Sequence, residues 1–114
     1  MNFIGYEEVR RFLIETEFDF APSQQEISFP IIQRIHRRLQ QGNSFKAIKV
    51  KENVIVDGHH RYISHKLLAI ESETILGNSI TESIKYVWSE INLTAIDCDN
   101  ENDRKMFEER YDKQ

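Results

Sequence analysis

The sequence contains a single cysteine, Cys98, and no long apolar run. One cysteine cannot form an internal disulfide, and it excludes a zinc site with four thiolate ligands. No stretch approaches the roughly 20 apolar residues of a membrane-spanning helix. The first residues, MNFIGYEEVRR, lack the basic segment followed by an apolar stretch that marks a signal peptide. We therefore expect a cytoplasmic protein without membrane contact, although a delivered effector that carries no such signal also fits.

Internal repeats and low-complexity tracts are absent as well, and the length sets a further limit. The 114 residues can form one two-layer core, but not a catalytic domain plus a separate recognition domain. We expect one domain over residues 1–114. Its predicted parts are an N-terminal helix and connector (1–22), a core (23–72), and additional strands with an acidic C-terminal helix (73–114).

The net charge of -4 is unevenly distributed along the chain. Residues 1–26 carry -4, residues 27–70 carry +6, and residues 71–114 carry -6. A basic centre between acidic flanks favours binding of an anion by the middle of the chain. The alternative is that the charge blocks pair with one another across the fold. The overall acidity argues against non-specific coating of duplex DNA, which requires many phosphate contacts.

The first half of the chain shows the spacing of two amphipathic helices. Residues 5–17 form the first, with an apolar face of Tyr6, Val9, Phe12 and Leu13. A connector over residues 18–26 follows. Ser28 can cap the second helix and Pro30 suits its first turn. This helix continues to Gln41 with Ile31, Ile32, Ile35 and Leu39 on one face. Arg34, Arg37 and Arg38 lie away from that face; a solvated basic face is the favoured interpretation, and an extension of the anion site is the alternative. Gly42 ends it as a left-handed cap.

The second half alternates between strands and helices. Phe45–Val50 and Val54–Val56 are predicted strands of a hairpin that turns at Lys51-Glu52-Asn53. A helix after Gly58 buries Ile63, Leu67 and Ile70, and residues 71–83 form a loop. The last elements are two strands and a short helix from Asn100: Ile84–Trp88, Ile91–Ile96, and a tail with Met106 and Phe107 as apolar contacts. We expect a small α/β fold with a mixed sheet flanked by helices.

The stretch VIVDGHHRYISHKLLAI places its densest group of ionisable side chains where the strand turns into the helix. The unpaired N–H groups and the dipole of a helix N-terminus form a phosphate site. Gly58 permits close backbone approach or a positive φ, and Arg61 can grip a phosphate at two points. His59 and His60 supply donors beside it, and we expect all three side chains at an exposed helix end, with histidine titration near pH 6–7. Asp57 can cap the helix, bind a metal ion or act as a base.

A structural explanation of the same residues stays open. An Asp-Gly pair before a helix is a common turn and cap, so Asp57 and Gly58 alone do not indicate function. The two adjacent histidines point about 100° apart on a helix. His65 follows His60 by five positions rather than the four of a helical two-histidine site, which argues against zinc.

IVDGHHRYISHKLLAI resembles the strand–helix signature of the ParB/sulfiredoxin superfamily. The preceding FPIIQRIHRRLQQGNSFKAIKVKENVIV is similar to the helix, glycine and hairpin that lead into that signature, and the resemblance covers roughly residues 24–72. Members include a CTP-dependent partition clamp, an ATP-dependent sulfinate reductase, a free-serine kinase and proteins assigned as nucleases. The resemblance implies a ParB/sulfiredoxin-like fold that binds phosphate groups at this junction.

The resemblance also implies roles for individual residues. Gly58 and Arg61 match the shared phosphate-binding positions, and Lys46 is a further phosphate-binding candidate. His60 matches the histidine of the reductase signature, and Asp57-Gly58-His59 matches the start of the kinase signature. Glu26 is the nearest counterpart of the upstream catalytic glutamate of the kinase. Asp57, with Glu26, is the candidate ligand for Mg²⁺, and a nucleoside triphosphate is the implied substrate or ligand.

Departures from the family pattern exclude two of its activities. His59 replaces the nucleophilic cysteine of the reductase, and Cys98 lies far away in the sequence. The partition clamp has an arginine-rich signature and a DNA-reading domain, for which this chain has neither the arginines nor the length. Lys46-Ala47 stands where a proline usually precedes the hairpin. The tail WSEINLTAIDCDNENDRKMFEERY resembles C-terminal tails of bacterial effector domains with this fold.

Two classes of function follow. The favoured one is an enzyme for phosphoryl transfer, or for hydrolysis of a phosphodiester or nucleoside triphosphate, in the manner of a nuclease, NTPase or phosphotransferase. Asp57, His59, His60 and Glu26 are its candidate catalytic residues. The alternative is a non-catalytic module that binds a nucleotide, or a protein partner in a complex of the toxin–immunity type. A fold resemblance cannot choose between them.

Overall fold

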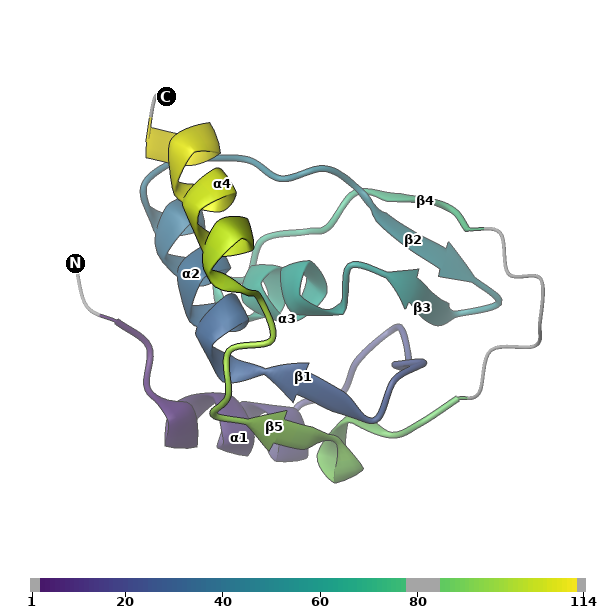
Figure 1. The fold of residues 1–114 in the computed structure, drawn as a ribbon. Coiled ribbons are helices and arrows are strands. Elements are labelled where there is room, and N and C mark those ends of the chain that lie inside the picture. Colours follow the sequence, from purple (N-terminus) through teal and green to yellow (C-terminus); the bar gives the residue numbers. More distant parts are fainter. Residues whose placement is uncertain (1–2, 78–84, 113–114) are drawn as a thin grey trace.

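The protein combines short helices with short strands, which confirms the predicted α/β class (Figure 1). A computed structural model describes residues 3–77 and 85–112. Within these residues the elements follow in the order α1 (Tyr6–Glu15), β1 (Glu26–Ser28), α2 (Phe29–Gln40), β2 (Ile48–Lys51), β3 (Val54–Asp57), α3 (His59–Leu67), β4 (Thr74–Leu76), the 3-10 helix η1 (Trp88–Glu90), β5 (Asn92–Thr94) and α4 (Glu101–Asp112).

The described strands form two small sheets, and one of them is mixed, as the sequence predicts. One sheet has the order β3-β2-β4, in which β2 pairs antiparallel with β3 and parallel with β4. The other consists of the parallel pair β1 and β5. β1 lies where the sequence predicts the end of a connector and the cap of a helix, and β4 lies in a predicted loop. Strands of three residues leave too short a pattern to detect.

The N-terminal ends of α1 and α2 differ in whether a nearby side chain caps them. In α1 the Glu8 carboxylate accepts a hydrogen bond from the Gly5 N–H at 3.2 Å, and Val9 and Leu13 are buried as predicted. Ser28 stands at the N-cap of α2 and Pro30 lies in its first turn. The expected cap bond is wrong, however, because the Ser28 hydroxyl donates to the Ile96 carbonyl at 3.0 Å. This bond ties the start of α2 to the chain after β5.

The hairpin between β2 and β3 turns where the sequence predicts it. Glu52 and Asn53 have φ values of 52° and 65°, which match the two-residue turns that suit the twist of a hairpin. Gly42 ends the second helix region with φ 92°, as expected for a left-handed cap. The predicted burial of Ile70 is wrong, because α3 ends before this residue and its side chain is 41% exposed.

The predicted strand Ile84–Trp88 is also wrong over the residues that the structure describes, while Ile84 lies outside them. Residues 85–87 form no regular element, and the 3-10 helix begins at Trp88. The Tyr86 N–H donates to the Pro22 carbonyl at 2.9 Å. The Trp88 indole N–H donates to the Phe20 carbonyl at 2.7 Å. These bonds hold the segment against the connector that precedes β1.

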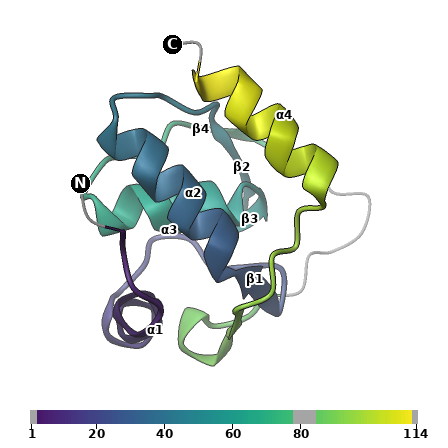
Figure 2. The same cartoon turned by 60° about the vertical axis from the view of Figure 1, so that its left-hand side comes forward.

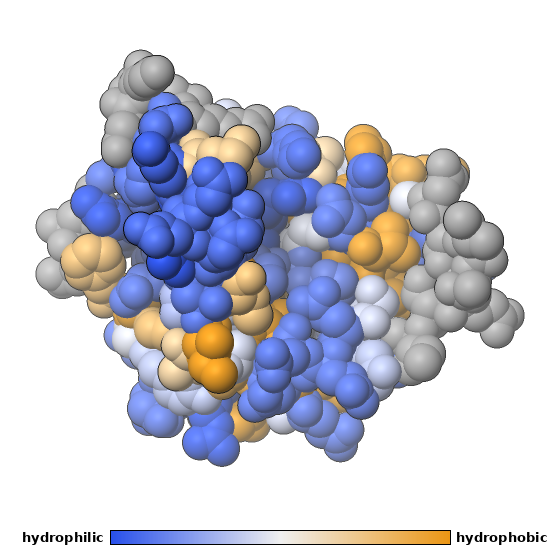
Figure 3. Space-filling view, viewed as in Figure 1, coloured by the Kyte–Doolittle hydropathy of each residue, from blue (hydrophilic) through white to orange (hydrophobic). Residues whose placement is uncertain are grey.

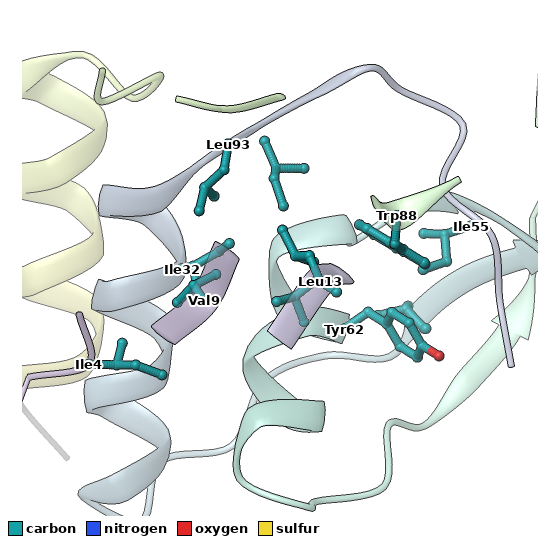
Figure 4. Close-up of a cluster of buried hydrophobic side chains, with 11 residues drawn as sticks. Ile4, Val9, Leu13, Ile32, Ile55, Tyr62, Trp88 and Leu93 are labelled. Atoms are coloured by element: carbon teal, nitrogen blue, oxygen red, sulfur yellow. The ribbon is translucent and has the colours of Figure 1, made fainter. Parts of the chain in front are cut away.

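One cluster of buried apolar side chains draws on all three predicted segments of the chain (Figure 4). It joins Val9 and Leu13 of α1 to Tyr62 of α3 and to Trp88 and Leu93 near the C-terminal end. The cluster also contains Ile4, Ile27, Ile32, Ile48, Ile55 and Ile63. Because Tyr62 and Ile63 are 1% and 0% exposed, the first turn of α3 is fixed by the core just beneath it. None of the described helices is long and apolar enough to span a membrane.

Candidate phosphate-binding site

The junction between β3 and α3 has the predicted strand–glycine–helix geometry. β3 ends at Asp57, Gly58 adopts φ 97° and ψ 28°, and α3 starts at His59. The first N–H groups of α3 have no preceding turn of helix to accept their hydrogen bonds. Among the residues that the structure describes, no side chain caps them either. The junction therefore presents a helix N-terminus with its positive dipole end.

Arg61 folds back over this turn. Its Nη2 lies 3.3 Å from the Ala47 carbonyl and 3.4 Å from the Asp57 carboxylate, which are both long for hydrogen bonds. A Cβ atom built on Gly58 would lie 2.8 Å from the same Nη2, so the glycine makes room for the guanidinium. The Arg61 Nε is buried and has no hydrogen-bond partner within the described residues. A buried donor without an acceptor is costly, and an anionic ligand is one way to satisfy it.

A cavity of about 400 Å³ lies beside this arginine. Its walls come from α2, α3, the loop before β2, the segment leading into α4, and α4 itself. Three cations face it, Arg34, Lys46 and Arg61, together with two carboxylates, Asp99 and Asp103. The remaining lining residues are apolar: Ile31, Ile35, Phe45, Met106 and Phe107. The structure thus brings the two predicted phosphate ligands Lys46 and Arg61 to one cavity.

The two histidines are engaged in backbone hydrogen bonds. The His59 Nε2 accepts from the Ser23 N–H at 3.0 Å, and the His60 Nε2 accepts from the Ser28 N–H at 2.9 Å. An Nε2 that accepts is unprotonated, so the proton of each neutral ring is on Nδ1. Both rings therefore attach the start of α3 to the segment that contains β1.

The environment of these rings corrects two expectations. The sequence places both histidines at an exposed helix end, but His59 is 4% exposed and His60 is largely buried. Burial, reinforced by the neighbouring His60, lowers the pKa of His59 to about 4. Burial and the charges of Arg34 and Arg61 lower the pKa of His60 to about 4. Titration near pH 6–7 is therefore not expected of either, and their roles as acid or base stay predictions.

The predicted carboxylates lie in different settings. The Asp57 side chain is 55% exposed and adjoins Arg61 at the turn. Glu26, at the start of β1, accepts a hydrogen bond from Asn92 Nδ2 at 2.8 Å and is exposed. No group of three potential metal-ligating side chains occurs in the part of the chain that the structure describes. At the junction, Asp57 is the carboxylate that would hold a Mg²⁺ ion, and the ion would take its further ligands from phosphate and water.

Acidic and basic blocks of the chain do pair with each other in several places. Arg34 contacts Asp97 and Asp99, and Arg38 pairs with Glu108. The alternative explanation of the charge pattern therefore holds for these arginines, which the sequence assigns to a solvated face. Arg61 differs, because its ion pair is with Asp57 of its own block.

Sequence reasoning identified the junction and offered Arg34 as an extension of the anion site, but it missed the aromatic part of the cavity. Arg34 lines the cavity together with Ile31 and Ile35 of the same helix. Phe45 and Phe107 stack with their ring centroids 6.2 Å apart. No local pattern links two phenylalanines so distant in sequence.

A second cavity of about 390 Å³ lies between α1 and the segment that contains η1. It is lined largely by apolar and aromatic side chains such as Phe18 and Trp88, and it contains none of the predicted site residues.

Comparisons of the chain with protein-family models, curated proteins and solved structures find no match. The resemblance to the ParB/sulfiredoxin superfamily therefore stays a prediction from the residues that carry it.

Proposed function

We propose that this protein binds a phosphate group of a nucleotide or nucleic acid in the cavity at the Gly58–Arg61 junction. The observation that carries the proposal is the buried Arg61 Nε, which has no acceptor among the described residues and belongs to a side chain that lines the cavity. Lys46 lines the same cavity and supplies a second positive charge. Gly58 holds the turn that brings the Arg61 guanidinium to the helix N-terminus.

The chemistry of these groups suits phosphate. A guanidinium donates two parallel hydrogen bonds to a tetrahedral oxyanion, and both its fixed charge and its planarity favour that geometry. A helix N-terminus adds N–H donors and a favourable dipole. The apolar lining of the cavity lowers the local dielectric, which strengthens each charge-assisted bond.

Calorimetric titration with Mg²⁺ complexes of ATP, CTP, GTP and UTP, and with a single-stranded oligonucleotide, tests the proposal. Arg61→Gln should weaken binding by about 10- to 150-fold, because it removes charge-assisted hydrogen bonds of roughly 1.5–3 kcal/mol. Arg37→Gln is the matched control, because it removes the same charge from an exposed side chain that lies over the Phe3 ring and is not among the residues lining the cavity. Equal weakening by both substitutions, or no binding of any of these ligands, would refute the proposal and favour a protein partner.

A second candidate function is hydrolysis or phosphoryl transfer on the bound ligand, and Asp57 carries it. Its carboxylate is exposed beside Arg61, where it can take a proton from an attacking water or hydroxyl group, or hold a Mg²⁺ ion against a phosphate. The histidines are less suited to this task near neutral pH because their Nε2 atoms are occupied and their pKa values lie near 4.

Turnover of a nucleoside triphosphate by the wild type and by Asp57→Asn tests this second function. The substitution should lower turnover by about 10²–10⁴-fold and leave binding within a small factor. Loss of turnover in His59→Gln or His60→Gln, with unchanged turnover in Asp57→Asn, would transfer the role to a histidine. A wild type that binds without turnover assigns the protein to the non-catalytic class.

A further inference from the structure

The chain that leads from β5 into α4 places carboxylates on a cation of the cavity. Arg34 donates from Nη1 to Asp97 at 2.5 Å, and from Nη2 to Asp97 at 3.0 Å and to Asp99 at 2.7 Å. The Arg34 side chain is only 17% exposed. Two carboxylates therefore surround one guanidinium in the two-point geometry that a phosphate group would also adopt.

Arg34 also lies close to the predicted phosphate-binding junction. It lines the same cavity as Lys46 and Arg61. α2 also contacts α3 directly, because the Ser64 hydroxyl donates to the Ile32 carbonyl at 3.3 Å. The shared cavity and this helix contact therefore place Arg34 of α2 near Arg61 of α3.

α4 is also held by contacts that do not involve Arg34. Glu108 of α4 pairs with Arg38, and Phe107 stacks on Phe45. Asp97 also accepts bonds from the Asp99 N–H and from Arg104 at 3.0 and 3.3 Å. Figure 2 shows α4 lying next to α2, and the surface over α4 is mostly hydrophilic (Figure 3). α4 therefore has contacts with α2 and with the loop before β2 that do not depend on the bonds between Arg34 and the two carboxylates.

We propose that Arg34 is a second phosphate-binding residue of the cavity, and that Asp97 and Asp99 compete with the ligand for it. This inference rests on the proposed phosphate-binding function and adds its regulation. The acidic segment acts as an internal competitor, so the wild type binds phosphate compounds more weakly than its three cavity cations allow. Release of Arg34 from the two carboxylates should raise the affinity most for a ligand with several phosphate groups, because such a ligand can reach Arg61 and Arg34 together.

Calorimetric titration with inorganic tripolyphosphate tests the competition. The double variant Asp97→Asn/Asp99→Asn should bind it about 5- to 150-fold more tightly than the wild type, the usual range of coupling between competing contacts. Glu101→Gln/Glu109→Gln is the matched control, because it removes the same charge from exposed positions of α4. Thermal melting of each variant confirms that it is folded.

The same titrations in an Arg34→Gln background complete a double-mutant cycle. Without Arg34, the two asparagines should no longer tighten binding. Equal tightening by the control pair, or tightening that persists without Arg34, would overturn the inference and reduce it to a net-charge effect. Equal affinities of the wild type and the Asn pair, with loss of binding in Arg61→Gln, would refute the competition and leave the proposed function intact. Absence of binding in every variant would refute both.

Discussion

Substitution of Gly58 by alanine separates the structural role of the turn from its role in binding. Gly58 has φ 97°, and a Cβ atom there would lie 2.7 Å from Ile48 Cγ2 and 2.8 Å from Arg61 Nη2. Ile48 is fully buried in the core and cannot move aside cheaply, whereas the Arg61 head is the end of a long side chain and can. The first contact should therefore reduce stability, and the second should displace the phosphate-binding group.

The loss of stability expected in Gly58→Ala has two contributions. A left-handed φ costs a residue with a Cβ atom about 1–2 kcal/mol, and the overpacked contact with Ile48 adds about 1–3 kcal/mol. Gly42 provides the matched control, because it has φ 92° but a Cβ atom there would meet nothing within 4 Å. Gly42→Ala should therefore cost only the backbone contribution.

Urea unfolding of both alanine variants, with nucleotide titration of each, measures these contributions. We expect Gly58→Ala to lower the free energy of unfolding by about 2–5 kcal/mol and to weaken ligand binding. Gly42→Ala should lower it by about 1–2 kcal/mol with unchanged binding. Equal losses of stability in the two variants would show that the close approach to Ile48 is absent. Unchanged binding in folded Gly58→Ala would show that the position of the Arg61 guanidinium does not matter.

Three further predictions concern stability. The pKa values of His59 and His60 fall from 6.5 to about 4 on folding. Between these pH values the unfolded chain binds more protons than the folded one. The free energy of unfolding should therefore decrease as the pH falls from 6.5 to 4, by up to about 3 kcal/mol for each ring. Urea unfolding at several pH values measures this loss, and His60→Gln, which keeps an acceptor for the Ser28 N–H, should flatten it; an unchanged slope would contradict the assignment. Glu52→Gly should raise the free energy of unfolding by up to about 1 kcal/mol in the same assay, because glycine relieves the positive φ at this position, and a loss of stability would contradict this. Ile63→Ala should lower it by about 2–5 kcal/mol, since the side chain is fully buried, and a loss below 1 kcal/mol would indicate that the core is not packed as described.

The features that the sequence predicts correctly are local ones. The glycine with positive φ, the helix that follows it, and the hairpin turn at Glu52 and Asn53 each depend on neighbouring residues, so their signals lie in short stretches of sequence. The amphipathic faces of α1 and α2 are likewise readable from spacing.

The features that the sequence does not reveal depend on distant partners. The burial of His60 requires the Ser28 N–H, and the pairing of Arg34 requires Asp97, which is 63 positions later. The cavity exists because α4 returns to α2 near the end of the chain (Figure 1). Such contacts are set by the packing of the whole fold, and no local pattern specifies them.

A crystal structure of the protein with a Mg²⁺–nucleoside triphosphate complex tests the central claim most directly. The account predicts a phosphate oxygen about 3 Å from the Arg61 Nε, with Lys46 and the first N–H groups of α3 around the same phosphate. A triphosphate located instead in the cavity between α1 and Trp88, or a complex in which Arg61 Nε still lacks an acceptor, would contradict it.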